Sequence, residues 1–264
     1  MEIGGAVVVV TGASGGLGGA IASALNAKGA RLILTGRREE ELKGLASQLN
    51  GAEIVVCDLA DREQVAGLTA RLADTDIVVA NAALPATGRL EDFTPEELDR
   101  ALDVNLRVPM QMTQQLLPGM LRRRRGHFVY ISSISGKLPT ARAPIYSATK
   151  YGLRGFCASL RQDLHGTGVS ASVVFPGSVT DAGMLVDARI GVPPGSKGVS
   201  SEAIARGVIT AIEKDRAEVD AADLPVRILA KFGGTAPDLI ARLTRRKDAI
   251  AYSDQLSERL RHLR

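Results

Sequence analysis

Hydrophobic and polar positions divide the chain into short apolar runs and longer segments of mixed character. The apolar runs are typical of buried strands, whereas the mixed segments repeat small, apolar and polar residues at helical spacing. Strands are predicted at 6–10, 31–35, 54–57, 77–80, 127–132 and 170–175, and Val219 marks a short last strand. Helices are predicted at 20–25, 39–49, 61–73, 95–121 with a kink at Pro109, and 146–164. This alternation predicts an α/β fold, a doubly wound parallel sheet of about seven strands with helices on both faces.

Length and composition favour a single domain. With 264 residues, 45% of them hydrophobic, the chain can bury one sizeable core, which we expect within residues 1–222. Residues 223–264 read as a basic helical tail that packs on the same domain or on a neighbouring subunit. Peripheral contact of this tail with an anionic membrane is the alternative. Its apolar residues at helical spacing and the basic residues around them are Tyr252, Leu256, Leu260, Leu263, Arg242, Arg245, Arg246, Lys247, Arg259, Arg261 and Arg264.

Charge and composition argue against several other classes of protein. The net charge is only +4, and aromatic residues make up 3% with no Trp, so no nucleic-acid partner is expected. Cys57 and Cys157 are far apart in the chain and read as reduced core residues. His127, His165 and His262 lack ligand spacing, so no metal is predicted. We find no signal peptide and no apolar run long enough to span a membrane, and we expect a cytoplasmic protein.

A glycine-rich turn follows the first predicted strand. The strand at 6–10 leads into Thr11-Gly12-Ala13-Ser14-Gly15-Gly16-Leu17-Gly18 and then into the first helix. Such a turn directs backbone N–H groups and the helix dipole at an anion, and glycine lets a pyrophosphate approach the backbone closely. The context predicts a dinucleotide site formed by Gly12, Ser14, Gly15, Gly16, Leu17 and Gly18.

A second group of residues offers acid–base chemistry. Tyr146 and Lys150 are four residues apart in a predicted helix, so they share one face, one turn apart. A nearby ammonium favours the phenolate and lowers the pKa of a tyrosine, which makes Tyr146 a candidate general acid/base. Ser133, at the end of the strand before this helix, is a candidate to hold a substrate oxygen by hydrogen bond.

Together these residues resemble the motifs of the classical short-chain dehydrogenase/reductase family. Thr11-Gly12-x-x-x-Gly16-x-Gly18 resembles the family's TGxxxGxG loop, and Ser133 with Tyr146-x-x-x-Lys150 resembles its serine and YxxxK pair. The resemblance covers roughly residues 5 to 220 and implies a Rossmann-type fold and hydride transfer between a nicotinamide and a secondary alcohol or ketone. It also implies that Asn105 is a fourth catalytic residue, which holds a water that relays protons toward the lysine. Further cofactor contacts implied by position are Asp58, Leu59, Asn81, Ala82, Tyr146, Lys150, Pro176, Gly177 and Val179.

The end of the second strand indicates the preferred cofactor. An acidic residue there would accept hydrogen bonds from an adenosine ribose and repel a 2′-phosphate, but the chain has Arg37 and Arg38. Two guanidinium groups suit a phosphate, so NADP(H) is predicted over NAD(H). The alternative is that both arginines are solvated at the start of a helix.

Two departures from the family's pattern affect the cofactor site. After the fourth strand the family usually has Asn-Asn-Ala-Gly, whereas this chain has Ala80-Asn81-Ala82-Ala83, and alanine tolerates a positive φ poorly. The loop is therefore expected to follow a slightly different path. After the sixth strand Thr180 comes one position early and Asp181 occupies the place of the expected threonine, which puts a contact to the nicotinamide amide in question.

An apolar substrate pocket is expected from three loops. Its predicted walls are 84–90, 138–145 and the segment after Gly177, with 191–198 as a movable hinge. The apolar wall residues named by this prediction are Leu84, Leu138, Pro139, Met184 and Leu185. A run of arginines at 122–125 is expected to be the solvated end of a helix, with a phosphate- or membrane-facing patch as the alternative.

The sequence thus predicts an NADP(H)-dependent oxidoreductase that forms a homodimer or homotetramer. Two other functions stay open. A non-catalytic NADP(H)-sensing regulator would keep the glycine loop but would not need the serine, tyrosine and lysine. A lyase or epimerase with tightly bound NAD would usually be longer and would prefer an acid after the second strand.

Overall fold

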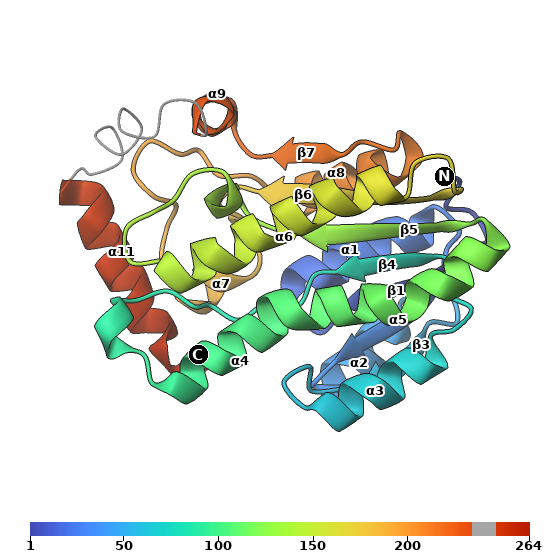
Figure 1. Ribbon diagram of the computed structural model, residues 1–264. Helices are drawn as coiled ribbons and strands as arrows, with labels where there is room; N and C mark the ends of the chain where they lie inside the picture. Colours follow the sequence, from blue (N-terminus) through green and yellow to red (C-terminus); the bar gives the residue numbers. More distant parts are fainter. Residues whose placement is uncertain (234–246) are drawn as a thin grey trace.

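The computed structural model of the protein describes residues 1–233 and 247–264. In these ranges one sheet contains β1 (Val7–Thr11), β2 (Arg31–Gly36), β3 (Glu53–Val56), β4 (Ile77–Ala80), β5 (Gly126–Ile131), β6 (Val169–Pro176) and β7 (Glu218–Ala221). The order across the sheet is β3-β2-β1-β4-β5-β6-β7, and all neighbours are parallel (Figure 1). The predicted α/β class and the Rossmann-type parallel sheet are confirmed.

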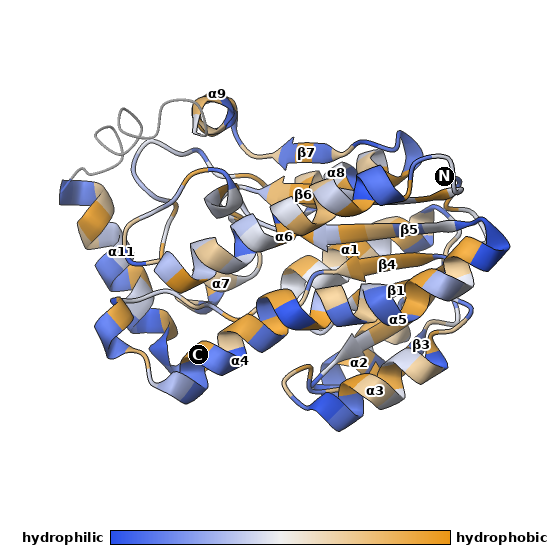
Figure 2. Ribbon diagram, viewed as in Figure 1, coloured by the Kyte–Doolittle hydropathy of each residue, from blue (hydrophilic) through white to orange (hydrophobic). Residues whose placement is uncertain are grey.

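Helices cover both faces of the sheet, and side-chain alternation along the strands divides the core in two. On one face Val8 and Val10 pack in a cluster with α1 (Gly16–Ala27), α2 (Glu39–Ala46) and α8 (Ser201–Glu213). On the other face Val9 packs with α3 (Arg62–Arg71), α5 (Val108–Arg123) and α6 (Pro144–Asp163). The central strands are accordingly the most hydrophobic part of the molecule (Figure 2). The other α-helices among the described residues are α4 (Pro95–Leu102), α7 (Met184–Asp187), α9 (Leu224–Phe232) and α11 (Lys247–Leu260).

The helix predicted over 95–121 is two helices joined by a π-helical turn. α4 ends at Leu102, the π-helical turn spans Asp103–Arg107, and α5 begins at Val108. Pro109 lies in the first turn of α5 and has no N–H to donate to the carbonyl of Asn105. The predicted helix is therefore present, and the irregularity expected at Pro109 includes a wider turn around Asn105.

Helix α8 has no counterpart among the predicted elements. Ile204, Val208 and Ile212 are buried at four-residue spacing, which is a helical signal present in the sequence.

The predicted exposed helix end at 122–125 is confirmed, and it also joins α5 to the loop before β4. Arg123 donates hydrogen bonds to the carbonyls of Ala73 and Thr75 at 3.0 and 2.9 Å.

The carboxyl ends of the parallel strands lie at one edge of the sheet. In such folds ligands bind in the crevice beyond this edge, between loops that leave neighbouring strands. The loops after β1, β4, β5 and β6 all emerge there, which brings the predicted site segments to one place (Figure 1). No helix of residues 1–233 and 247–264 is both long and apolar enough to span a bilayer.

Candidate functional site

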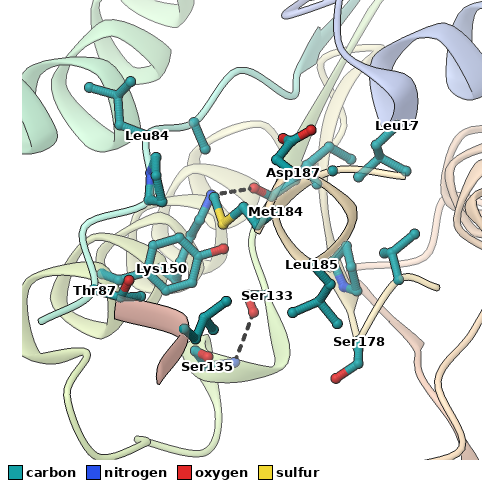
Figure 3. Close-up of a pocket in the computed structure, with 18 of the residues that line it drawn as sticks. Leu17, Leu84, Thr87, Ser133, Ser135, Lys150, Ser178, Met184, Leu185 and Asp187 are labelled. Carbon is teal, nitrogen blue, oxygen red and sulfur yellow. Dashed lines mark hydrogen bonds between the residues drawn. The ribbon is translucent and has the colours of Figure 1, made fainter. Parts of the chain in front are cut away.

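A cavity of about 1050 Å³ opens at the carboxyl edge of the sheet. Its wall includes the glycine loop, the ends of β2 and β3, and the loops after β4, β5 and β6. In Figure 3, Ser133 and Lys150 lie between Leu84 and Thr87 on one side and Ser178 and Leu185 on the other. The cavity therefore joins the predicted dinucleotide site to the predicted acid–base residues.

The glycine loop forms a cradle that side chains would obstruct. Gly12 has φ 67°, and a Cβ built there would lie 2.9 Å from the Cα of Ala82. A Cβ on Gly36 would lie 2.7 Å from the Oγ of Ser14. Asn81 braces the loop, since its Nδ2 donates to the carbonyl of Thr11 at 2.9 Å.

The first turn of α1 follows the cradle, so unpaired backbone N–H groups and the positive end of the helix dipole are available beside it. The predicted residues Gly12, Ser14, Gly15, Gly16, Leu17 and Gly18 all line the cavity. This arrangement fits an elongated anion held close to the backbone, as the pyrophosphate of a dinucleotide would be.

Two arginines line the cavity beyond this cradle. The Nη2 of Arg38 donates to the carbonyl of Ser14 at 2.5 Å, and its Nη1 lies 3.5 Å from a carboxylate oxygen of Glu41. Arg37 is exposed and makes no ion pair with any residue that the structure describes. Arg38 thus holds the loop, whereas Arg37 presents an uncompensated charge.

The predicted adenine contacts also lie on the cavity wall. Asp58 accepts a hydrogen bond from the backbone N–H of Ala60 at 2.9 Å, and Leu59 is buried in the core beside it. Asn81 and Ala82 line the cavity on the side of β4, and Pro176, Gly177 and Val179 line it after β6.

Ser133, Tyr146 and Lys150 come together at the ends of β5 and α6. Pro144 opens α6, which puts Tyr146 in the first turn, and the backbone N–H of Tyr146 donates to the carbonyl of Ala86 at 3.2 Å. The Nζ of Lys150 donates to the carbonyl of Ile131 at 2.9 Å and lies 5.4 Å from the centre of the Tyr146 ring. The Ser133 hydroxyl accepts a hydrogen bond from the N–H of Ser135 at 3.1 Å.

Burial dominates the electrostatics of this group. It raises the pKa of Tyr146 to about 12, although the hydrogen bond with Ser133 acts in the opposite direction. Burial also lowers the pKa of Lys150 to about 8. The pKa of Tyr146 thus lies above its ordinary value and not below it as expected, because desolvation disfavours the charged phenolate.

Asn105 holds the loop after β4 and does not itself line the cavity. Its Oδ1 accepts the N–H of Leu84 at 2.7 Å, and its Nδ2 donates to the carbonyl of Leu84 at 3.0 Å. The side chain is fully buried in the π-helical turn. Both ends of the amide are thus used to fix the segment that carries Leu84 into the wall.

The two departures from the family's pattern have local solutions. Ala83 is absent from the positive-φ residues of the described chain, so the loop there places no strain on alanine. Asp181 accepts hydrogen bonds from the N–H of Ser201 at 2.7 Å and from its hydroxyl at 3.0 Å. Asp181 therefore anchors the start of α8, and among the described residues neither it nor Thr180 lines the cavity.

The lining of the cavity agrees only in part with the predicted substrate wall. Leu84, Met184 and Leu185 line the cavity, as do Pro193 and Pro194 of the predicted hinge. Leu138 and Pro139 do not belong to the described lining. Leu138 is buried against Ala230 of α9 instead, because this loop turns its apolar side chain under that helix.

The C-terminal segment supplies a wall that the sequence did not predict. Tyr252, Leu256 and Leu263 line the cavity, together with Val226 and Leu229 of α9. Long-range contacts hold this wall in place. The Tyr252 hydroxyl donates to the carbonyl of Gly191 at 2.8 Å, Arg142 pairs with Asp254 at 2.6 Å, and Arg264 donates to the carbonyl of Thr87 at 2.7 Å.

The helical spacing of Tyr252, Leu256, Leu260 and Leu263 could have indicated an apolar face, but not what that face covers. Arg242, Arg245 and Arg246 of the predicted basic tail lie outside the described residues. Within residues 1–233 and 247–264, no three His, Cys, Asp or Glu side chains cluster as metal ligands would.

Comparisons with known proteins place the chain among oxidoreductases. Residues 6–190 match the short chain dehydrogenase family. The ketoacyl reductase HetN of Nostoc sp. is 30% identical over 96% of this chain and 93% of its own length. Dehydrogenase/reductase SDR family member 7B of Bos taurus is 33% identical over 90% of this chain and 80% of its own.

Solved structures give the same result. A metagenomic short-chain oxidoreductase in complex with NADP is 32% identical, with a TM-score of 0.69 over 83% of this chain and 97% of that one. A putative beta-ketoacyl-ACP reductase is 26% identical, with a TM-score of 0.75 over 84% of this chain and 98% of that one.

Proposed function

The chain belongs to the short-chain dehydrogenase/reductase family of oxidoreductases, and on that premise we propose that it transfers a hydride between NADP(H) and an apolar secondary alcohol or ketone. The observation that carries this proposal is the shared cavity. One continuous space is lined by the glycine cradle at one end and by Ser133, Tyr146 and Lys150 at the other. A dinucleotide lying in that space would reach from the arginines after β2 to the phenol.

Three features support NADP(H) as the cofactor. The end of β2 carries Arg37 and Arg38 and no acidic residue, and Arg37 has no anionic partner among the described residues. Guanidinium groups bind phosphate with charge-assisted hydrogen bonds. The 32% identical metagenomic oxidoreductase was solved in complex with NADP. Gly12, Gly16, Asp58, Asn81 and Gly177 would complete the cofactor site.

The side chains around the substrate have separate roles in this proposal. Ser133 holds the substrate oxygen by hydrogen bond, and Tyr146 exchanges a proton with that oxygen at its phenol. A phenol with a pKa near 12 stays protonated at neutral pH, so the side chain is ready to act as the acid in carbonyl reduction. Bound nicotinamide supplies the hydride.

Lys150 and Asn105 act around that proton transfer. The Lys150 ammonium is placed by the carbonyl of Ile131, where its charge stabilises negative charge that develops on Tyr146. Asn105 positions the wall through Leu84. The apolar residues Leu84, Leu185, Leu256 and Leu263 exclude water and favour apolar substrates.

The test is turnover of a ketone and alcohol panel, followed by nicotinamide absorbance with NADPH and with NADH. We expect reduction of apolar ketones with NADPH, and a loss of about 10²–10⁴-fold in kcat for Tyr146→Phe, which removes the proton donor. NADPH affinity, measured by fluorescence, should change little. The control is Tyr151→Phe, an exposed tyrosine on the same helix.

Turnover by Tyr146→Phe at the rate of the unmodified chain would remove Tyr146 from the mechanism. Tight NADPH binding without turnover of any carbonyl or alcohol would instead favour a nucleotide-sensing protein.

A further inference from the structure

Polar groups without partners gather in one corner of the cavity, where the C-terminal 3₁₀ turn Arg261–Leu263 lies beside α4 (Figure 1). Of the residues that the structure describes, nine side-chain nitrogen or oxygen atoms are buried without a hydrogen-bond partner, and four of these atoms are in this corner. They are Oγ1 of Thr87, Nε of Arg100, and Nε and Nη1 of Arg264. A buried polar atom that stays unpaired costs stability, so a concentration of them indicates a place where a polar ligand fits.

Hydrogen bonds and stacking connect these three residues. Arg264 donates from Nη2 to the carbonyl of Thr87 at 2.7 Å, and Arg100 donates from Nη1 to the backbone oxygen of Arg264 at 3.5 Å. The Arg264 guanidinium also lies over the ring of Phe93, 4.1 Å from its centre. Thr87 and Arg100 line the cavity and Arg264 does not, so Arg264 supports the corner while the other two residues face a ligand.

The unused side of the Arg100 guanidinium has the geometry that binds a carboxylate. A guanidinium carries its Nε–H and one Nη2–H side by side, as a fork that donates to both oxygens of a carboxylate. In Arg100 the Nη1 group is turned to Arg264, Nε has no partner, and Nη2 makes no hydrogen bond with a described residue. Thr87 adds an unpaired hydroxyl in the same corner.

The positive charge of the two arginines is not paired locally. Neither Arg100 nor Arg264 forms an ion pair with a residue that the structure describes. Burial lowers the pKa of Arg264, and the charge of Glu97 acts in the opposite direction. The Glu97 carboxylate, however, accepts the N–H of Thr94 at 2.9 Å and so caps α4. The corner therefore favours an anion from outside the chain.

The acidic residues on the substrate side of the wall lie away from this corner. Asp248 is in the first turn of α11 and Leu260 is at its end, so roughly 18 Å of helix separates them at about 1.5 Å per residue. Leu260 directly precedes the 3₁₀ turn of the corner. In Figure 3, Asp187 lies beside Met184, across the cavity from Thr87. An anion bound in the corner is thus closer to cations than to these carboxylates.

The corner is adjacent to the acid–base residues. The carbonyl of Ala86, next to Thr87, accepts the backbone N–H of Tyr146 at 3.2 Å. Ala101, which follows Arg100 in α4, packs in one cluster with Ala86 and Tyr146. A substrate held in the corner can therefore keep its carbonyl at the phenol.

We propose that Arg100 and Thr87 bind a carboxylate of the substrate, so that the ketone reduced here is an oxo acid with an apolar chain. This inference rests on the proposed hydride transfer and names the substrate class for it. The carboxylate oxygens accept from the Arg100 fork and from the Thr87 hydroxyl, and the apolar chain lies against Leu256 and Leu263. The acid group anchors the molecule, while Tyr146 acts on its carbonyl.

Carboxylate binding can be tested without turnover. Isothermal titration of the whole chain, with and without NADP⁺, compares octanoate with octanamide, which has the same chain and no charge. Octanoate should bind about tenfold more tightly or better. Arg100→Gln should weaken octanoate binding about 10–100-fold, the effect of one or two charge-assisted hydrogen bonds, and Thr87→Val should weaken it about threefold. Arg100→Lys keeps the charge without the fork, so its affinity should fall between those of Arg100→Gln and the unmodified chain.

The matched control is Arg89→Gln, because Arg89 is an exposed arginine close to Thr87 in the chain and does not line the cavity. It should bind octanoate as the unmodified chain does, and circular dichroism melting checks that each variant is folded. Equal binding of octanoate and octanamide would overturn the proposal, and so would unchanged octanoate binding by Arg100→Gln. Tighter binding of octyl phosphate than of octanoate would overturn the choice of a carboxylate.

Turnover separates this inference from the reaction on which it rests. With NADPH and oxo acids of increasing chain length, kcat/KM should be higher for each acid than for its methyl ester, and Arg100→Gln should lower this ratio about tenfold or more. Reduction of the esters as fast as the acids would overturn the inference and leave the proposed oxidoreductase standing. Octanoate binding that depends on Arg100, without turnover of any ketone, would support the carboxylate site and overturn the proposed reaction.

Discussion

The two sides of the cavity are built in different ways. Most of the nucleotide side comes from three successive strand-to-helix connections within the first 59 residues, after β1, β2 and β3, and Asn81 after β4 braces it. The substrate side collects segments from Leu84 to Leu263, including two helices that follow the last strand. Local backbone conformation therefore shapes most of the first side, whereas long-range contacts hold most of the second.

The contacts that hold each side illustrate this difference. On the nucleotide side the cradle depends on the backbone conformation of Gly12, with φ 67°, and one hydrogen bond from Asn81 braces it. On the substrate side Tyr252 and Gly191 are 61 residues apart, and Arg264 and Thr87 are 177 apart. Changes on the first side should act through cofactor binding, and changes on the second should act through substrate size.

The largest expected effect on ligand binding is that of Gly12→Ala. The new Cβ would meet the Cα of Ala82 at 2.9 Å in a backbone conformation that alanine disfavours, so the loop must move away from the cofactor. We expect NADPH affinity in a fluorescence titration to fall about 100-fold or more, since one misplaced cradle loses several charge-assisted hydrogen bonds. Gly51→Ala is the control, because Gly51 has φ 68° with no atom within 4 Å of the added Cβ. Gly51→Ala should be destabilised by the same backbone strain but should bind NADPH as tightly as the unmodified chain. Equal NADPH affinity of the Gly12 and Gly51 variants would contradict the assignment of the glycine loop to the cofactor.

A smaller effect on the same side is expected for Arg37→Asp. The change removes the exposed cation after β2 and places a carboxylate where a ribose hydroxyl could donate to it. The ratio of kcat/KM for NADPH over NADH should fall roughly 10–100-fold, the value of one or two charged hydrogen bonds. Arg31→Asp, at the opposite end of the same strand, should leave the ratio as it is. An unchanged ratio for Arg37→Asp would show that Arg37 does not select the cofactor.

The smallest expected effect belongs to the substrate side. Leu256→Ala removes part of the apolar wall contributed by α11, and KM for bulky apolar ketones should rise about fivefold. The KM for a small ketone that does not reach this wall should stay unchanged, and so should the affinity for NADPH. Gln255→Ala, an exposed neighbour, serves as the control. If Leu256→Ala altered NADPH affinity instead, the division of the cavity into two sides would be wrong.

The same division explains what the sequence could predict. The glycine loop, Ser133, Tyr146 and Lys150 are recognisable because their spacing alone places them at strand ends and on one helical face. Asn105 was placed in a helix, but the π-helical turn around it was not predicted, although Pro109, which cannot donate to the carbonyl of Asn105, is a local signal of an irregular turn.

The substrate side could be predicted only in outline. The turn of Leu138 away from the cavity follows from the position of α9, which no local pattern reveals. Similarly, the apolar spacing from Tyr252 to Leu263 predicts a helix but not the cavity beneath it. The pKa of Tyr146 was misjudged because the cost of burying a charge depends on surroundings brought together only by folding.

The all-parallel order of the sheet also bears on how a newly made chain reaches this state. Val8 of β1 pairs with Ile77 of β4, and no neighbouring strands here can be joined by a hairpin. Each pairing must first close a long loop, a topology that slows refolding and leaves apolar strands uncovered meanwhile. On the ribosome, the Ser133–Tyr146–Lys150 end of the cavity cannot form until β5 and α6 have emerged. A nascent chain halted earlier would expose the unpaired edge of β4 and would be a natural client for chaperones.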